Sequence, residues 1–225
     1  MSDQTADELL RALLARRGTD VPRAGWKVAL NVPGVQRRLG LSRSLAAPLF
    51  QLQVQSNGAA LALPQDTLLH VEAELALRLR TDVTESKSTD VLRALVDSYA
   101  LCLELVDYNK PRDNLDAMFA HSFFHAGVVL GEWQGAHAFE ALRSDYPNAT
   151  DSSGKPYPRH ADTVPADIVE ALRILADRVL AAGATLRAGE VVICGSYIDP
   201  VPLPVGARVC VNYGLTHAPL SVSRV

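Results

Sequence analysis

A run of alternating apolar and polar residues at positions 67–80 constrains the fold more than any other feature of the sequence. The apolar members that share one face are Val71, Ala73, Leu75, Leu77 and Leu79. The polar members of the other face are His70, Glu72, Glu74, Arg78 and Arg80. A period of two predicts a β-strand, because successive side chains of a strand point to opposite faces. The apolar face must be buried, so Glu72 and Glu74 stand side by side, toward either solvent or a polar cavity.

A second alternating run, at 100–107, predicts another strand and places Glu104 between two leucines. If Glu104 joins Glu72 and Glu74, the three charges repel, and at least one carboxyl stays protonated unless a cation is present. The hard cations Mg²⁺, Mn²⁺ and Ca²⁺ accept all-oxygen ligand shells. The spacing alone leaves a second interpretation open. In it, the two glutamates of the first run lie on a solvated sheet face beside nearby arginines, and Glu104 pairs with an arginine.

Lys27 lies between Trp26 and Val28 in a short apolar run at 25–31, which we expect to be a strand. Burial there would make its amine a proton donor or acceptor in catalysis. The alternative is a surface lysine whose aliphatic stem passes over Trp26.

Two further motifs carry polar chemistry. His121 and His125 have the i, i+4 spacing that could hold zinc on a helix at 114–124, but the sequence offers no third soft ligand, so a hydrogen-bonded histidine is the simpler interpretation. Gly195 and Ser196 end an apolar run, where amides and a hydroxyl could meet a carboxylate or form an ordinary turn. The motifs of nucleotide-binding loops and of serine hydrolases do not occur.

The remaining patterns place the chain in the α+β class. We expect helices at 5–17, from Pro33 to Gly40, around 91–96, at 114–124 and at 165–182. We expect further strands at 126–131, 191–194, 207–213 and 219–225, a hairpin at 48–64 around Ser56-Asn57-Gly58, and a loose hairpin at 138–162. Residues 1–24 then form a short N-terminal helical segment, a lid or arm, and residues 25–225 a single domain.

Composition excludes several classes of partner. The chain has 225 residues and a net charge of −3, without a long Lys/Arg run, which argues against nucleic acid. It has no stretch of 18 apolar residues, which argues against a membrane. The start shows no signal-peptide pattern, and the three cysteines form no CxxC motif, so we expect reduced thiols in a cytoplasmic protein.

Six segments, taken in chain order, carry a resemblance to a known family. They are Gly25-Trp26-Lys27-Val28-Ala29-Leu30, Val71-Glu72-Ala73-Glu74-Leu75-Ala76, Leu103-Glu104-Leu105-Val106-Asp107, Val128-Val129-Leu130-Gly131, Leu186-Arg187-Ala188-Gly189-Glu190-Val191-Val192 and Cys194-Gly195-Ser196. The chain resembles the fumarylacetoacetate hydrolase superfamily over about residues 22–225, and within it the branch of 2-keto-4-pentenoate hydratases and oxalocrotonate decarboxylases.

The resemblance implies a mixed β-roll with flanking helices, a Mg²⁺ or Mn²⁺ ion and a homo-oligomer. It assigns metal binding to Glu72, Glu74 and Glu104, proton transfer to Lys27, and substrate binding to Gly195 and Ser196. We therefore expect a lyase, a hydratase or decarboxylase, that acts on a 2-oxo or 2-hydroxydienoate acid through a metal-bound enolate.

Three departures from the hydratases keep other activities open. The region before the Gly-x-Lys strand is short, Gln51 follows Leu49-Phe50 where an aspartate is usual, and segment 108–125 differs from what the branch leads us to expect. His121 or His125 could then take over proton transfer, and we expect His121 to be catalytic. The alternatives are an acylpyruvate-type C–C hydrolase and a non-catalytic partner subunit of a decarboxylase or hydratase.

Overall fold

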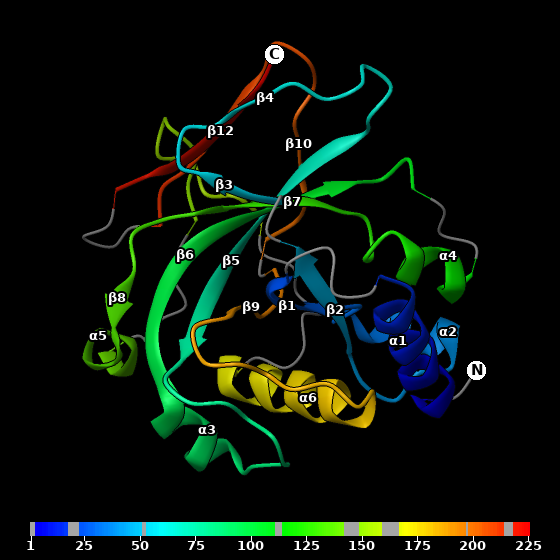
Figure 1. Cartoon of the computed structure of the whole chain (residues 1–225). Helices are drawn as coiled ribbons and strands as arrows, with labels where there is room; N and C mark the ends of the chain where they lie inside the picture. Colours follow the sequence, from blue (N-terminus) through cyan, green and yellow to red (C-terminus); the bar gives the residue numbers. More distant parts are fainter. Residues whose placement is uncertain are drawn as a thin grey trace.

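Two long antiparallel strands, β5 (Leu69–Leu79) and β6 (Val96–Asp107), form the centre of the molecule (Figure 1). The computed structural model describes residues 3–17, 23–50, 53–110, 114–141, 149–158, 167–196, 198–213 and 218–225. In these residues nine strands make one curled mixed sheet, whose main path runs β2-β1-β9-β5-β6-β7-β3. Three strands make a smaller sheet in the order β11-β12-β4. The predicted α+β class is confirmed.

The other strands are short. Those before the central pair are β1 (Arg23–Ala29), β2 (Leu45–Phe50), β3 (Val54–Ser56) and β4 (Ala60–Leu61). Those after it are β7 (His125–Leu130), β8 (Gln134–Gly135), β9 (Val191–Ile193), β10 (Val201–Pro202), β11 (Arg208–Val211) and β12 (Leu220–Arg224).

Six helices lie around the sheet in the described part of the chain (Figure 1). They are α1 (Asp3–Arg17), α2 (Pro33–Leu39), α3 (Thr89–Leu95), α4 (Leu115–Ala120), α5 (Ala136–Ala141) and α6 (Ile168–Ala181). Asp167 caps the N-terminus of the long helix α6, and its carboxylate accepts a hydrogen bond of 2.7 Å from the backbone N–H of Val169. Such a cap satisfies an N–H group that has no partner within the helix. None of these helices has both the length and the apolar character needed to cross a lipid bilayer.

The two faces of the β5–β6 pair have different surroundings. The apolar face predicted from the alternation is buried in the main core, together with the apolar stripe of α6. The other face turns toward β1 and β9, and next to the glutamates it carries three small side chains: Ala76, Ala100 and Cys102 are fully buried there in one cluster with Val191 and Ile193. Small side chains on the concave face of the curled sheet leave room for the glutamates on the same face.

Helix α1 is fastened to the body of the protein by Arg178 of α6. The Arg178 side chain is almost fully buried and forms ion pairs of 3.0 Å with both Asp3 and Asp7 of α1. Its Nε also donates to the carbonyl of Ser44, at 3.1 Å. The helix predicted at 5–17 is therefore present, and a buried guanidinium joins it to α6 and to the start of β2.

Two predictions of local structure were wrong, and a third was correct only in part. Residues 48–64 do not form a hairpin: β3 pairs in parallel with β7, and β4 pairs in parallel with β12 of the smaller sheet. The helix predicted at 114–124 ends at Ala120, and after its C-cap His121 the chain turns through Ser122, Phe123 and Phe124, which have positive φ angles. The loose hairpin predicted at 138–162 is present in its middle, where Thr150 forms an antiparallel bridge with Pro156 and the N–H of Tyr157 donates to the carbonyl of Ala149. Residues 138–141 belong instead to helix α5, and residues 142–148 and 159–162 lie outside the described residues.

Candidate active site

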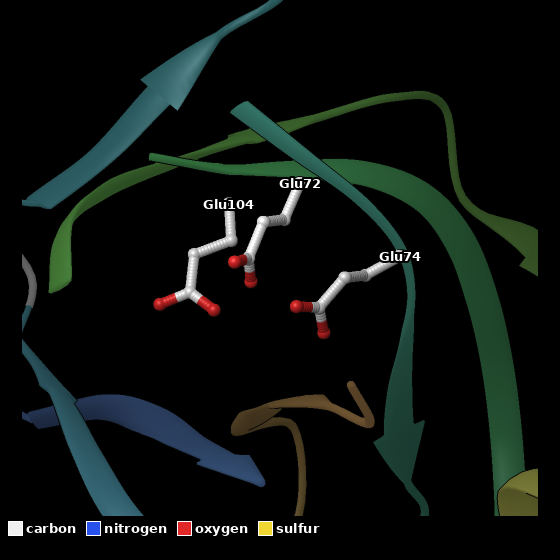
Figure 2. A group of neighbouring side chains, drawn as sticks. All are labelled: Glu72, Glu74 and Glu104. Carbon is white, nitrogen blue, oxygen red and sulfur yellow. The ribbon is translucent and has the colours of Figure 1, made fainter. Parts of the chain in front are cut away.

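The register of β5 and β6 brings the three predicted glutamates together. Glu72 of β5 lies directly opposite Glu104 of β6, and Glu74 follows two residues later on the same face. Each offers one carboxylate oxygen to a group in which all three oxygens lie within 4.8 Å of one another. Figure 2 shows the three side chains converging on one space. Glu74 and Glu104 are each only 1% exposed, so the interpretation as a solvated acidic face does not hold.

Each carboxylate is held by a donor from a different part of the chain. The hydroxyl of Tyr108 donates to Oε1 of Glu72 at 3.0 Å, and the backbone N–H of Gly195 donates to Oε2 of Glu74 at 2.7 Å. Oε1 of Glu104 receives two groups: the ammonium of Lys27 and Nδ1 of His125, the latter at 2.8 Å. One oxygen of every glutamate is thus fixed by the protein. No hydrogen bond within the described residues is made to the other oxygen.

The three carboxyls have different pKa values. Burial and the charge of Glu104 raise the pKa of Glu72 to about 7, and the same two causes raise the pKa of Glu74 well above its ordinary range. Burial also opposes ionisation of Glu104, but Lys27 and His125 bring its pKa below the ordinary value. Mutual repulsion of this kind is relieved by a cation, and an all-carboxylate donor set suits a hard divalent ion. The residues present therefore fit Mg²⁺ or Mn²⁺.

A cavity of about 150 Å³ opens beside the glutamates. Its polar wall consists of the three carboxylates, Lys27, Asn31, Tyr108, Gly195 and Ser196. Its apolar wall consists of Val28, Ala29, Leu30, Val32, Val35, Val106, Phe123 and Phe124. Among the described residues that line it, Lys27 is the only cation, and that lysine already contacts Glu104. The cavity thus combines one acidic end with an apolar remainder.

The predicted residues Lys27, Gly195 and Ser196 all line this cavity, and Gly195 and Ser196 make hydrogen bonds within the protein. Lys27 is 4% exposed, as the buried alternative required. The Gly195 N–H is taken by Glu74, and the Ser196 hydroxyl donates to the carbonyl of Ile198 at 2.9 Å. These contacts hold the wall of the site together.

The structure does not bring His121 to the cavity. Helix α4 ends at Ala120, so His121 is its exposed C-cap residue. The two histidines therefore do not have the i, i+4 arrangement of a helix. His125 instead begins β7 as a buried residue against Glu104. Burial lowers the pKa of His125, so its neutral ring donates Nδ1–H to the carboxylate. Of the two histidines, His125 contacts the site.

Sequence reasoning did not identify Asn31 or Tyr108 as site residues. Tyr108 directly follows β6, the strand that carries Glu104, and this position was the only signal in the sequence that its hydroxyl could reach the acidic group. Asn31 stands just beyond β1, four residues after Lys27, and only the path of the chain through Leu30 shows that it faces the cavity.

A family model of the fumarylacetoacetate (FAA) hydrolase C-terminal domain matches residues 31–212, a span that contains all three glutamates. The chain belongs to this family. One curated relative is a protein from Burkholderia vietnamiensis that is named 2-keto-4-pentenoate hydratase. It is 27% identical over 208 residues, which cover 86% of this chain and 72% of the relative. A protein of the same name from Paraburkholderia phymatum is 29% identical over 191 residues, which cover 76% of this chain and 67% of that relative.

The fold of this family member is also that of a solved enzyme. The 4-oxalocrotonate decarboxylase from Pseudomonas putida G7, determined with magnesium and adipate, superposes with a TM-score of 0.80 at 14% identity, covering 94% of this chain and 81% of the decarboxylase. The family model and the two hydratase relatives confirm the resemblance to this branch of the superfamily, and the superposition confirms the β-roll expected from it.

Proposed function

We propose that the chain is a divalent-metal-dependent lyase that acts on a 2-oxo or 2-hydroxydienoate acid, in the manner of a 2-keto-4-pentenoate hydratase. The observation that carries the proposal is the group of Glu72, Glu74 and Glu104 in a buried cavity, with the ammonium of Lys27 on the third carboxylate. The names of the two curated relatives support the reaction class.

The three glutamates would hold Mg²⁺ or Mn²⁺ through the oxygens that the protein leaves free. When bound there, such an ion supplies Lewis-acid chemistry that polarises the 2-oxo group of a chelating acid. Tyr108 and the N–H of Gly195 keep two of the carboxylates in position. Donors around metal-binding carboxylates orient them and tune their basicity.

Lys27 and His125 form a proton-holding group with Glu104. Nζ of Lys27 lies at the cavity wall and contacts Oε1 of Glu104, which also accepts Nδ1–H of His125. In the proposed reaction, Nζ of Lys27 exchanges a proton with the substrate as it passes between its enol and oxo forms, and its positive charge offsets the substrate carboxylate. Glu104 and His125 keep this amine in place during the transfer.

The walls of the cavity favour a substrate with one carboxylate and an apolar tail. A second carboxylate would have to lie among Val32, Val35 and Phe124, since no further cation lines the described part of the cavity. A buried charge without a partner is strongly unfavourable. We therefore place a short 2-oxo-alkenoate ahead of a dicarboxylic acid such as the substrate of an oxalocrotonate decarboxylase.

The test is to follow the absorbance of 2-hydroxypenta-2,4-dienoate with purified protein and Mg²⁺ or Mn²⁺, in the wild type and in Glu72→Gln and Glu104→Gln. We expect metal-dependent loss of the dienoate, and loss of turnover in both variants while their circular dichroism is unchanged. Equal turnover in the variants, or in the presence of a chelator, would refute the proposal.

Decarboxylation is the second candidate, and the high TM-score to the decarboxylase favours it. Both reactions pass through the enol form, so the product distinguishes them: a decarboxylase releases CO₂ from a 2-oxo-dicarboxylate, and a C–C hydrolase of the superfamily releases two acids. A chain that is silent alone but active with an added hydratase or decarboxylase subunit would be a partner subunit. We also propose a homo-oligomer, which light scattering of the purified protein tests.

A further inference from the structure

A buried amide without a partner stands on the wall of the cavity. Nδ2 of Asn31 has no contact with solvent and no hydrogen-bond partner within the described part of the chain, and Asn31 is one of the residues that line the cavity. Buried amide groups are nearly always paired, because an unpaired one loses its hydrogen bonds to water without replacement. An exception on the wall of a ligand cavity indicates that the missing partner is the ligand.

The backbone before Asn31 is arranged in an uncommon way. Leu30 has a φ of 55°, a left-handed conformation that is rare for a residue with a branched side chain. Its carbonyl accepts a hydrogen bond of 2.8 Å from Nε2 of Gln36, a buried side chain of α2. The chain therefore leaves β1 through a turn that a buried glutamine holds, and this turn places Asn31 over the glutamates. Residues in such conformations concentrate at functional sites.

The opposite wall makes room for the same amide. Gly195 has a φ of 99°, and a Cβ atom at this position would lie 2.3 Å from Nδ2 of Asn31. The N–H of Gly195 holds Glu74, so the amide of Asn31 lies beside the carboxylate group and not at the apolar end of the cavity. Two independent features, the turn at Leu30 and the absence of a side chain at Gly195, thus bring one donor to the acidic end.

We infer that Asn31 binds the substrate directly, its side-chain N–H donating to an oxygen of the 2-oxo acid head group. The three carboxylates at this end of the cavity repel an anionic substrate, so a donor is needed beside them. Asn31 and Lys27 are the side chains there that offer N–H groups. This inference rests on the proposed function, because it takes the ligand to be a 2-oxo acid.

The experiment uses oxalate, a stable mimic of the 2-oxo acid head group, titrated by calorimetry into protein loaded with Mn²⁺. In Asn31→Leu, which keeps the approximate size but removes the donor, we expect oxalate to bind roughly 10- to 100-fold more weakly, the range for a hydrogen bond to a charged group. In Asn31→Asp, which also adds a negative charge, we expect a larger loss. The affinity for Mn²⁺ alone should stay within about twofold in Asn31→Leu, because this residue is not a metal ligand.

Stability of the protein without metal provides a second readout that a merely structural asparagine would not give. Removing an unsatisfied donor should leave the melting temperature of Asn31→Leu unchanged or raise it by roughly 2–8 °C. The matched control is Asn57→Leu: Asn57 lies outside this cavity and makes hydrogen bonds of 3.1 Å to the carbonyl of Pro219 and 2.9 Å from the N–H of Ser221. This control should melt lower and bind oxalate normally.

The outcomes separate the two proposals. Wild-type protein that binds neither Mn²⁺ nor oxalate refutes the proposed function. Wild-type protein that binds both, with unchanged oxalate affinity in Asn31→Leu, refutes the inference alone. A joint loss of Mn²⁺ and oxalate binding, or a marked fall in melting temperature in Asn31→Leu, also overturns it, since the amide would then support the fold or the metal ligands.

Discussion

Lys27→Met removes the ammonium from the carboxylate group while keeping the length and apolar stem of the side chain. Lys27 is 4% and Glu104 1% exposed, so this ion pair is shielded from solvent. With all three carboxyls ionised, the formal charge of the group is −2 with Lys27 and −3 without it. His125 then remains as the donor to Glu104.

Breaking one partner of a buried pair costs about 3–5 kcal/mol, because the other charge is left uncompensated. For a domain of this size, that loss lowers the melting temperature by about 6–20 °C. The sign of the pH dependence follows from Glu104. With Lys27 its pKa is below the ordinary value, so the pair stabilises the fold above the pKa of the unfolded chain, and this stability is lost as the pH falls. Without Lys27, burial raises the pKa and favours the neutral acid. The difference between the two proteins is therefore large at pH 8 and shrinks toward pH 4.

The assay is thermal unfolding at pH 8 and pH 4 in a chelator, and again at pH 8 with Mn²⁺ at saturating concentration. A cation bound only by the folded protein adds about 2.7 kcal/mol at 100 times its Kd, and the more negative variant should gain more than the wild type does. Lys110→Met is the matched control: Lys110 is 42% exposed and lies 3.3 Å from the buried Asp107, so solvent screens its charge and we expect its loss to cost about 0–1 kcal/mol. If Lys27→Met melts like this control at pH 8 in the chelator, the reasoning about the carboxylate group is refuted.

Three further predictions concern the site and its surroundings. Because the pKa of Glu72 is about 7, Mn²⁺ must displace a proton near neutrality, so its affinity should rise between pH 6 and 8 with proton release in calorimetry; a flat profile would contradict this. Tyr108→Phe removes the donor of Glu72 and should weaken Mn²⁺ binding about 10-fold in the same titration, with unchanged circular dichroism. Arg178→Leu leaves Asp3 and Asp7 without their buried cation, so amide exchange in α1 should accelerate about 10-fold or more, while Arg43→Leu, which removes a half-buried arginine, should have little effect.

The central strands and the acidic group could be predicted from the sequence because the same pattern encodes both. The period of two in residues 67–80 fixes which side chains are buried, and it places Glu72 and Glu74 on one face without further information. Glu104 could be expected to join them only as one of two interpretations. The choice depends on β5 and β6 being neighbours in register, and a contact of this kind between distant segments has no local signal.

The errors arose where tertiary contacts decide. Asn57 and Gly58 do form a turn, with Gly58 at a φ of 82°, but the strands on either side of it pair with β7 and β12 and not with each other. The turn residues therefore predicted the turn correctly, but the strands that flank it pair with strands far away in the sequence. His121 was expected to be catalytic because the chain departs from the hydratases, and helical spacing was expected to place it beside His125. Ser122, Phe123 and Phe124 all have positive φ angles, so the helix does not continue and the two histidines are moved apart. Because non-glycine residues rarely adopt this conformation, their residue types gave no signal for such a turn.

The direct pairing of Glu72 with Glu104 ties function to the alignment of two strands. If β5 shifted by one residue relative to β6, its two faces would exchange places. Its carboxylates would then lie in the apolar core against α6, and its leucines would lie in the cavity. Under the proposed function, Mn²⁺ titration therefore measures the fraction of correctly folded molecules in a preparation. A compact chain with misaligned strands would lack the group of three carboxylates, even though its circular dichroism spectrum were ordinary.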